Sequence, residues 1–396
     1  MKRTMMDGNQ AAAEAMRFAR IRVVSAYPIT PQSSIAETLA DFVADGSLQA
    51  KYLRIESEHS ALSSVIGAQL TGVRAGTATA SVGLALMHEV MGVASGLRLP
   101  IVMPVVNRSL VSPWNLWCDH QDAMAERDSG WTQLYAENCQ EVLDLILIAY
   151  RWSEYPKVLL PCMMNLDGFF LSHLTEVVML PEQETVDAFL PPYVPHNLLL
   201  DPDNPMFINN LTGPSEFTEM RFQQSLAFGE ALDTLPRVLE EFQQVFGRQY
   251  SLLDAYRCDD AEAVVVTMGS MSGTARYAVD QLRSEGKKVG ALKVVCFRPF
   301  PVTLLRQLLG GIPHVGVIDR SAGLGAESGP LCGEVRAALE LESPEVSGFI
   351  AGLGGRDVRL ETFRKAFDFL LNSPSTSNTT WLDVEANAMS IREVGV

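Results

Sequence analysis

Short apolar runs alternate with longer amphipathic segments along most of the chain. Such runs predict strands, and apolar positions three and four residues apart predict helices. In the first half, the predicted strands are 22–27, 53–56, 76–81, 100–106 and 158–160, and the predicted helices are 30–43, 60–70, 84–95 and 140–151. This alternation favours an α/β fold in which helices cover both faces of a parallel sheet.

The alternation stops at 181–214, where seven prolines predict an ordered but irregular arm. A long amphipathic segment at 216–246 leads into a second alternating unit, with strands at 263–268, 289–297, 314–318 and 349–351 and a helix at 274–285. Because 396 residues exceed one ordinary core, we expect two domains. We predict a first α/β domain at 1–235 that includes the arm, a linking helix and linker at 236–257, a second α/β domain at 258–372 and a polar tail at 373–396.

The composition, with 47% hydrophobic residues and a net charge of −16, is typical of a globular chain with an acidic surface. No basic patch stands out, so nucleic acids and anionic membranes are poor partners. The most apolar region, 78–106, is interrupted by His88, Glu89 and Arg98, which a lipid-facing helix would not carry. The basic start Met1–Arg3 is followed by the mostly polar residues 7–10 where a signal peptide needs an apolar stretch. We therefore expect a cytoplasmic protein.

The six cysteines are too far apart to form a run that binds zinc or an iron–sulfur cluster. The closest two, Cys118 and Cys139, are 21 residues apart. Structural disulfides are not expected in the cytoplasm, and free cysteine is among the most buried residue types. We expect mostly buried thiols and no metal centre on this chain.

Loops at predicted strand ends carry the candidate chemistry, because ligands bind there in doubly wound sheets. In the loop at 26–34, we expect Thr30 to cap its helix, with Pro31 at the first helical position, while the Thr30 hydroxyl can also donate to a ligand. In the segment 54–60, there are two interpretations of Glu56 and Glu58. Their charges stabilise the N-terminus of the following helix through its dipole, or a carboxylate there, surrounded by apolar neighbours, acts as an acid or base whose pKa is set by its surroundings.

Further polar groups follow the buried strand at 100–106. Arg108 either clamps a carboxylate through two hydrogen bonds or forms a structural ion pair. The polar run 118–131, with His120, is a site wall or a subunit interface. The segment Gly323–Gly329 is similar to G-x-G-x-x-G, but its last spacing is one residue too long and it comes late in the second unit. A Gly-rich turn is therefore the better interpretation.

Taken together, these motifs and their order resemble the alpha subunits of pyruvate:ferredoxin oxidoreductases, in the 2-oxoacid:ferredoxin oxidoreductase family. The resemblance covers nearly the whole chain and is weakest at 205–235 and after 372. The segments that carry it are Tyr27–Pro31, Glu56–Ala61, Thr77–Ser81, Gly83–Glu89, Asn107–Ser109, Asp119–Asp122, Arg127–Trp131, Glu137–Glu141, Phe297–Pro301 and Ala351–Asp357.

The resemblance implies a thiamine diphosphate-binding fold of the pyrimidine-binding type, followed by a transketolase C-terminal-like α/β domain. It also implies oxidative decarboxylation of pyruvate to acetyl-CoA and CO2, with electrons passed through iron–sulfur clusters to ferredoxin. Glu58 matches the glutamate that hydrogen-bonds N1′ of the cofactor pyrimidine, which favours the imino tautomer whose N4′ takes up the C2 proton. Thr30 and Arg108 match positions that hold the substrate carboxylate, and Pro28 and Ile29 match cofactor-binding positions.

The diphosphate–Mg²⁺ signature of thiamine enzymes, Gly-Asp-Gly with a downstream Asn, is absent from the sequence. The resemblance therefore implies half of an active site, completed by a beta subunit that holds diphosphate and Mg²⁺. Gamma and delta subunits would carry the 4Fe–4S clusters, and coenzyme A, the 2-oxoacid and ferredoxin would be the reaction partners.

Three alternatives remain open. The same chemistry can act on a branched-chain 2-oxoacid, 2-oxoglutarate or oxalate. The chain can also be a scaffold subunit that has lost catalysis. A nucleotide-binding regulatory module would rest on the loop Gly323–Gly329 alone.

Overall fold

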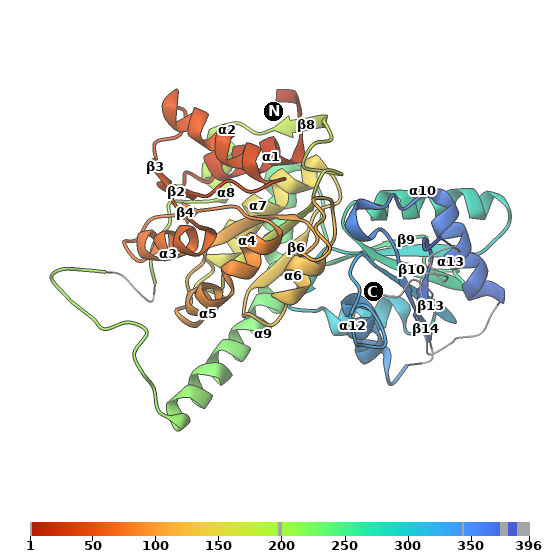
Figure 1. The fold of residues 1–396 in the computed structure, drawn as a ribbon. Helices are drawn as coiled ribbons and strands as arrows, with labels where there is room; N and C mark the ends of the chain where they lie inside the picture. The colour runs from red at the N-terminus through yellow and green to blue at the C-terminus, as the bar shows by residue number, and fades with distance from the viewer. Residues whose placement is uncertain (1, 197–199, 343, 373–378, 386–396) are drawn as a thin grey trace, which may run out of the picture. The chain divides into compact units, whose positions relative to one another are not determined.

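The computed structural model describes residues 2–196, 200–342, 344–372 and 379–385. The chain forms two compact units, Met1–Asp254 with Val294–Pro301, and Ala255–Lys293 with Val302–Val396. Each unit has an α/β core of its own (Figure 1). The segment Val294–Pro301, which we predicted inside the second domain, belongs to the first unit because its strand β12 (Cys296–Arg298) pairs with β6 (Thr132–Tyr135) there.

The central sheet of the first unit consists of a three-stranded part and a four-stranded part, built mainly on parallel strands and joined by a single bridge. One part has the order β3 (Lys51–Arg54), β2 (Val23–Ala26) and β4 (Ala75–Gly76). The other has the order β12, β6, β7 (Cys162–Asp167) and β5 (Val102–Asn107), and β12 is antiparallel to its neighbour. A parallel bridge between Thr79 and Val105 joins the two parts. All strands of this sheet except β12 therefore end at the same edge.

Two groups of helices pack against this sheet. In one group, α1 (Gly8–Phe18) contacts both α2 (Ser33–Ala44) and α7 (Cys139–Ser153). In the other, α3 (Glu58–Gln69) contacts α4 (Ser81–Leu86) and α5 (His88–Gly96). The side chains of Met103 and Val105, alternate residues of β5, are fully buried against this second group. A fully buried strand of this kind is typical of parallel sheets.

Two predicted elements are displaced. We expected Thr30 to cap a helix at 30–43, but α2 begins at Ser33 and its N-cap is Gln32. The reason is a turn over 29–32, closed by a 2.7 Å hydrogen bond from Gln32 N to Ile29 O. The strand predicted at 158–160 was also wrong, because Leu159 has a positive φ of 43° that interrupts an extended path, and the strand β7 starts only at Cys162.

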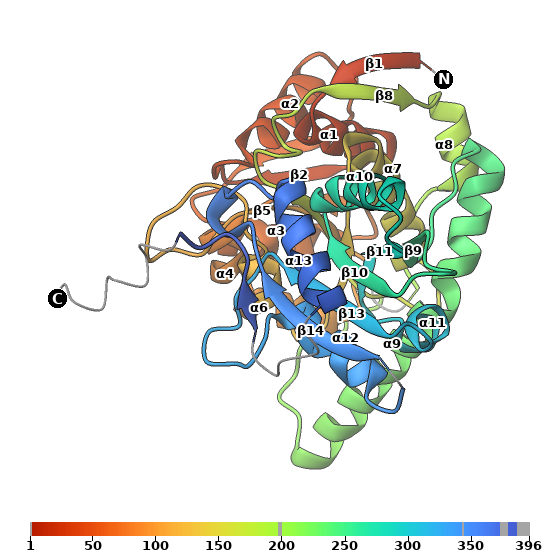
Figure 2. The same ribbon diagram turned by 90° about the vertical axis from the view of Figure 1, so that its right-hand side faces the viewer.

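The amino-terminal strand was not predicted at all. β1 (Lys2–Met6) pairs antiparallel with β8 (Glu176–Leu180), and the two lie side by side in Figure 2. In the described part of the proline-rich arm, residues Gln183–Phe189 form α8, and the amphipathic segment after the arm forms α9 (Pro214–Phe246). A short helix, α6 (Gln121–Ala125), follows β5.

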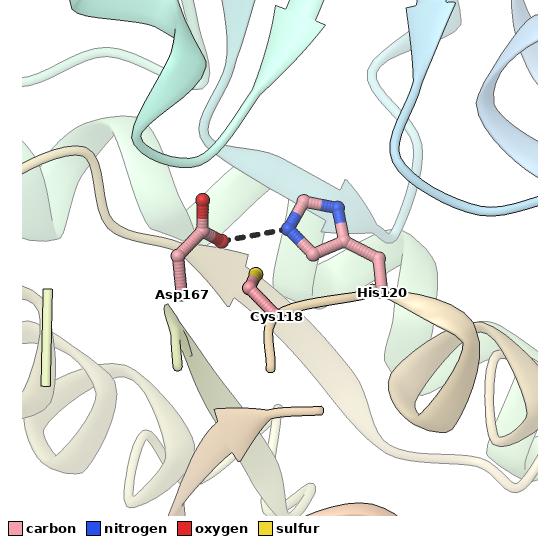
Figure 3. Close-up of side chains that lie close together, drawn as sticks. All are labelled: Cys118, His120 and Asp167. Atoms are coloured by element: carbon pink, nitrogen blue, oxygen red, sulfur yellow. Dashed lines mark hydrogen bonds and ion pairs between the residues drawn. The ribbon is translucent and has the colours of Figure 1, made fainter. Parts of the chain in front are cut away.

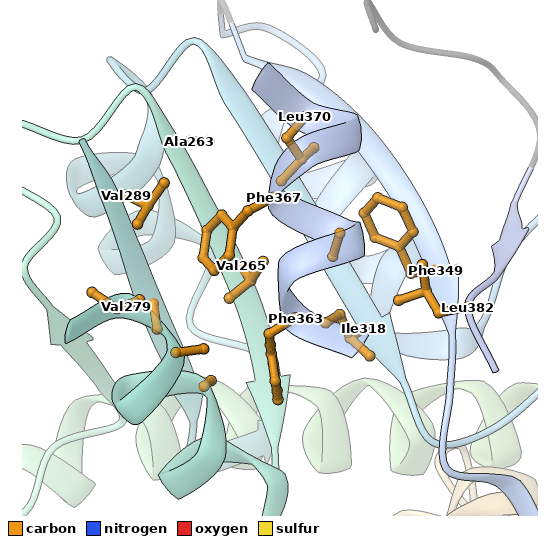
Figure 4. Close-up of a cluster of buried hydrophobic side chains, with 14 of the residues drawn as sticks. Ala263, Val265, Val279, Val289, Ile318, Phe349, Phe363, Phe367, Leu370 and Leu382 are labelled. Atoms are coloured by element: carbon orange, nitrogen blue, oxygen red, sulfur yellow. The ribbon is translucent and has the colours of Figure 1, made fainter. Parts of the chain in front are cut away.

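The second unit is a six-stranded sheet with helices packed against it. Its strand order is β15 (Thr380–Trp381), β14 (Glu345–Ile350), β13 (His314–Asp319), β10 (Ala263–Met268), β11 (Val289–Val294) and β9 (Leu253–Tyr256). Its helices are α10 (Met271–Ser284), α11 (Val302–Leu309), α12 (Pro330–Leu339) and α13 (Leu360–Asn372). Phe363 and Phe367 of α13 point toward the sheet and fill the core (Figure 4).

The predicted tail at 373–396 is described only at 379–385, where Thr380 and Trp381 add strand β15 to the sheet edge. The remainder of that segment lies outside the described residues. No helix within the described ranges combines the length and the apolar character that a membrane span requires.

Candidate active site at the carboxyl edge of the first sheet

The carboxyl ends of the parallel strands bring the predicted site residues to one edge of the sheet. β2 ends at Ala26, directly before the loop that contains Pro28, Ile29 and Thr30. β5 ends at Asn107, directly before Arg108. This is the edge at which open α/β sheets bind ligands.

Glu58 is the first residue of α3. The N-cap is Ser57, whose hydroxyl oxygen accepts a hydrogen bond from Ser60 N at 3.2 Å. The Glu58 side chain is only 6% exposed, yet its carboxyl group accepts no hydrogen bond from the residues placed in the structure. Because buried polar groups are almost always hydrogen-bonded, this carboxyl group is available to an N–H donor of a ligand.

The Glu58 carboxyl group occupies space that exists because residue 83 is glycine. A β-carbon at Gly83, on α4, would lie 2.6 Å from Oε1 of Glu58 and 2.6 Å from Oγ1 of Thr79. No side chain can be accommodated there unless both of these groups move. The close approach of α4 therefore fixes where the carboxyl group can lie.

Arg108 and Thr30 are in direct contact. The Arg108 guanidinium donates from Nη1 to the backbone oxygen of Thr30 at 2.8 Å, and from Nε to the backbone oxygen of Asn115 at 3.2 Å. Arg108 is buried, and this burial lowers its pKa, although Asp122 acts in the opposite direction. The contact joins the loop after β2 to the end of β5. Both side-chain partners of Arg108 among the described residues are carbonyl oxygens, so this part of the chain shows no ion pair with Arg108.

The two residues expected to touch the cofactor besides Glu58 lie in the same loop as Thr30. Pro28 is exposed and Ile29 is half-buried. The amide side chain of Gln32 accepts a 3.4 Å hydrogen bond from Ile29 N, and this holds the turn closed. The structure thus brings Pro28, Ile29, Thr30 and Arg108 together in one loop cluster.

Asp122 fixes the backbone around this cluster, and the sequence reasoning did not single it out. Its Oδ2 accepts hydrogen bonds from Ser81 N at 2.9 Å and from Arg108 N at 3.0 Å. Its Oδ1 accepts from Asn107 Nδ2 and Ala123 N. Burial raises the pKa of Asp122 and these four donors oppose that rise. Only the fold reveals this role, because the donors come from three separate segments.

Cys118, His120 and Asp167 form a buried cluster at the same edge (Figure 3). Nε2 of His120 lies 2.7 Å from Oδ1 of Asp167, and the imidazole packs against the ring of Tyr135. The ligand atoms all lie within 4.8 Å of one another, and the donor types suit zinc. However, the hydrogen bond already joins two of the three atoms, so we interpret the cluster as a structural pair beside a thiol.

Two further expectations can be compared with the structure. All six cysteines are buried and free, which confirms the prediction of buried thiols. The loop Gly323–Gly329 leads into α12, whose first amides at Leu331 and Cys332 donate to the carboxylate of Asp319 at 2.8 and 2.9 Å. An acidic side chain therefore lies where a bound phosphate would be placed.

Comparison with known proteins shows which family has a sequence similar to that of this chain. A family described as "Pyruvate flavodoxin/ferredoxin oxidoreductase, thiamine diP-bdg" matches residues 14–238, and "Pyruvate:ferredoxin oxidoreductase core domain II" matches residues 261–363. The pyruvate synthase subunit PorA of Methanothermobacter thermautotrophicus is 49% identical over 354 residues, 89% of this chain and 91% of the relative. The ketoisovalerate oxidoreductase subunit VorA of Pyrococcus horikoshii is 46% identical over 356 residues, 89% of this chain and 90% of the relative.

A solved structure agrees at the level of the fold. The 2-oxoglutarate:ferredoxin oxidoreductase from Magnetococcus marinus aligns with a TM-score of 0.72 and 19% identity, over 93% of this chain and 65% of that one. The predicted fold class, a thiamine diphosphate-binding α/β domain followed by a second α/β domain, is confirmed. The chain belongs to the pyruvate flavodoxin/ferredoxin oxidoreductase family.

Proposed function

We propose that the chain is the alpha subunit of a cytoplasmic thiamine diphosphate-dependent oxidoreductase that decarboxylates pyruvate to acetyl-CoA and CO2 and passes electrons to ferredoxin. The observation that carries the proposal is the buried Glu58 carboxyl group, which has no partner among the described residues and lies against Gly83. Family membership and the relatives named pyruvate synthase support the same activity.

The residues present fit the pyrimidine half of thiamine diphosphate. Glu58 offers a buried acceptor for a ring N–H, and the loop of Pro28 and Ile29 lies at the same edge. When bound, this cofactor supplies a carbon nucleophile for the carbonyl group of a 2-oxoacid and an electron sink for decarboxylation. Glu58 would hold a proton at the pyrimidine nitrogen and share it during turnover, which is general acid–base catalysis.

Arg108 and Thr30 would hold the substrate carboxylate. A guanidinium has five N–H donors, and two of them are directed to the carbonyl oxygens of Thr30 and Asn115. The donors that remain suit a carboxylate, and burial strengthens such a pair. Thr30 adds a hydroxyl group at the exposed rim of the loop.

A branched-chain 2-oxoacid is the second candidate substrate. The specific observation is the 46% identity to a relative named ketoisovalerate oxidoreductase, close to the identity with pyruvate synthases. A panel of 2-oxoacids assayed with the assembled enzyme separates the two, since the preferred acid will have the highest kcat/KM.

We also propose that a beta subunit supplies the diphosphate–Mg²⁺ half of the site, and that gamma and delta subunits carry the 4Fe–4S clusters. Surface character supports partners of this kind: the loop that holds Arg108 exposes Trp114 and Trp117, and Phe207 and Phe222 are exposed beyond it along the chain. We propose Trp114 and Trp117, next to the candidate site, as contacts for the partner subunit.

The test is reconstitution. The purified chain alone should not turn over pyruvate, coenzyme A and an electron acceptor, because a half-site lacks the positioned groups of its partner. Addition of the other subunits should restore turnover and tight binding of thiamine diphosphate. Turnover by the chain alone would refute the shared site. An assembled complex that still turns over when Glu58 and Arg108 are both replaced by Ala would favour a scaffold role.

A further inference from the structure

Thr79 lies at the junction between the two parts of the first sheet. Its backbone N donates to Pro104 O at 3.2 Å, and its backbone O accepts from Val106 N at 2.9 Å. The residue is fully buried. The backbone position is thus fixed by β5, and the side chain has little freedom to move away from its surroundings.

The Thr79 hydroxyl group has no hydrogen-bond partner among the residues described. A buried donor without a partner destabilises a folded chain, and a valine of the same shape would avoid this penalty. Neither packing nor the sheet hydrogen bonds require a hydroxyl group at this position. The fold alone therefore does not account for threonine here.

The Glu58 carboxyl group lies near this hydroxyl group. Oγ1 of Thr79 and Oε1 of Glu58 each lie 2.6 Å from the point where a β-carbon of Gly83 would be. The two oxygens are consequently separated by no more than twice that distance. Two buried polar side chains that lack partners among the described residues thus lie close together.

We infer that Thr79 is a positioning residue for Glu58. Its hydroxyl donates to one carboxyl oxygen when the group takes up its working orientation, which leaves the other oxygen for the ligand N–H. A hydrogen bond to a charged acceptor is shorter and stronger than one between neutral groups, so a single hydroxyl can fix the orientation. The inference rests on the proposed function, in which Glu58 contacts the cofactor pyrimidine.

The test compares Thr79→Val and Thr79→Ser in the full chain and in the assembled complex. Thermal denaturation of the chain without cofactor should show an unchanged or higher Tm for Thr79→Val. In the complex, hydrogen–deuterium exchange at C2 of bound thiamine diphosphate should slow about tenfold or more, the effect of losing a hydrogen bond to a charged group. Thr79→Ser, which keeps the hydroxyl, should recover most of that rate.

Thr77→Val is the matched control, because Thr77 carries an equally buried hydroxyl that has no partner among the described residues, two positions earlier. It should leave C2 exchange unchanged. Exchange at the wild-type rate in Thr79→Val, or no recovery in Thr79→Ser, would overturn the inference. The proposed function is judged separately by Glu58→Gln: if that variant is slow while Thr79→Val is not, only the role of Thr79 fails. Wild-type exchange in Glu58→Gln would overturn both.

Discussion

Arg108 reaches across the carboxyl edge of the sheet and donates a 2.8 Å hydrogen bond to the backbone oxygen of Thr30, 78 residues earlier in the chain. The two residues that we expect to hold the substrate carboxylate are therefore mechanically connected. Loss of the guanidinium removes a positive charge and also releases the loop after β2.

Arg108→Ala should weaken substrate use in the assembled enzyme. Truncating one partner of a buried charge pair costs about 2–5 kcal/mol, which would appear in kcat/KM for pyruvate. Arg108→Lys should recover only part of this, because an ammonium group cannot donate to Thr30, Asn115 and a carboxylate in the same planar geometry.

Arg98→Ala is the control for this prediction. Arg98 also donates to backbone carbonyl oxygens, Leu159 O at 3.2 Å among them, and burial lowers its pKa too. Its loss should lower stability without a specific effect on kcat/KM. Equal kinetic losses in the two variants would return Arg108 to a purely structural role.

Glu58→Gln should slow C2 deprotonation of the bound cofactor by about 10²- to 10⁴-fold, the usual contribution of a general acid–base group. Glutamine keeps the shape of the side chain, so the complex should still assemble. Hydrogen–deuterium exchange at C2 measures the step directly.

Glu56→Gln provides the matched comparison. Glu56 is exposed, and its carboxylate accepts a 2.5 Å hydrogen bond from the Ser60 hydroxyl, which lowers the pKa of Glu56. This interaction belongs to the start of α3, so the substitution should change exchange little. A large loss in Glu56→Gln alone would mean that the activating carboxyl group has been assigned to the wrong residue.

Patterns in the local sequence predicted the features that depend on residues close together in the chain, such as strands and the polar residues that follow them. The apolar run before Arg108 and the polar start of α3 placed Arg108 and Glu58 after strands, and parallel strands place such residues at one edge. The same signals misplaced the start of α2, because a threonine followed by proline is typical of a helix N-terminus and also of the turn found at 29–32.

Contacts between distant segments could not be predicted in this way. Asp122 accepts hydrogen bonds from Ser81 and Arg108, which no periodicity connects. β1 was missed because its partner β8 lies far along the chain, at Glu176–Leu180, and a five-residue strand at an edge has little pattern of its own. Only the fold shows that Gly83 matters as the residue that leaves space for Glu58.

Gly83→Ala tests whether the close approach of α4 at this glycine positions the Glu58 carboxyl group. The added β-carbon would lie 2.6 Å from Glu58 Oε1 and 2.6 Å from Oγ1 of Thr79, whose backbone is bound to β5, so both side chains would have to shift. We expect a chain that folds with a lower Tm and whose Glu58 carboxyl group is displaced, with C2 exchange reduced about 10²-fold or more. Exchange and Tm should both be measured.

Gly92→Ala serves as its control, because a β-carbon there meets nothing within 4 Å. Gly92 lies inside α5, so alanine should stabilise the chain by about 1 kcal/mol and leave exchange unchanged. If Gly83→Ala exchanges at the wild-type rate, the close approach of α4 does not define the position of Glu58.

The last prediction concerns the pH dependence of stability at Glu126, a buried carboxyl group whose Oε2 lies 2.7 Å from Nδ1 of the exposed His88. Burial raises the pKa of Glu126, and the hydrogen bond with His88 opposes this only in part. A raised pKa in the folded state means that the folded chain keeps this proton at a pH where the unfolded chain has lost it. Protonated Glu126 therefore makes its full contribution to the free energy of unfolding below the ordinary glutamate pKa. This contribution is lost as the pH rises through the pKa that Glu126 has in the folded chain.

Glu126→Gln removes the ionisation and keeps an acceptor oxygen for His88. The free energy of unfolding of this variant, relative to wild type, should therefore increase as pH rises from about 4 toward 7. Urea denaturation of the full chain at several pH values measures the difference. Asp128→Asn, at an exposed position two residues later, is the control for the removal of an acidic side chain from this segment. A Glu126→Gln difference that stays constant or shrinks as pH rises would show that His88, and not burial, dominates the ionisation of Glu126.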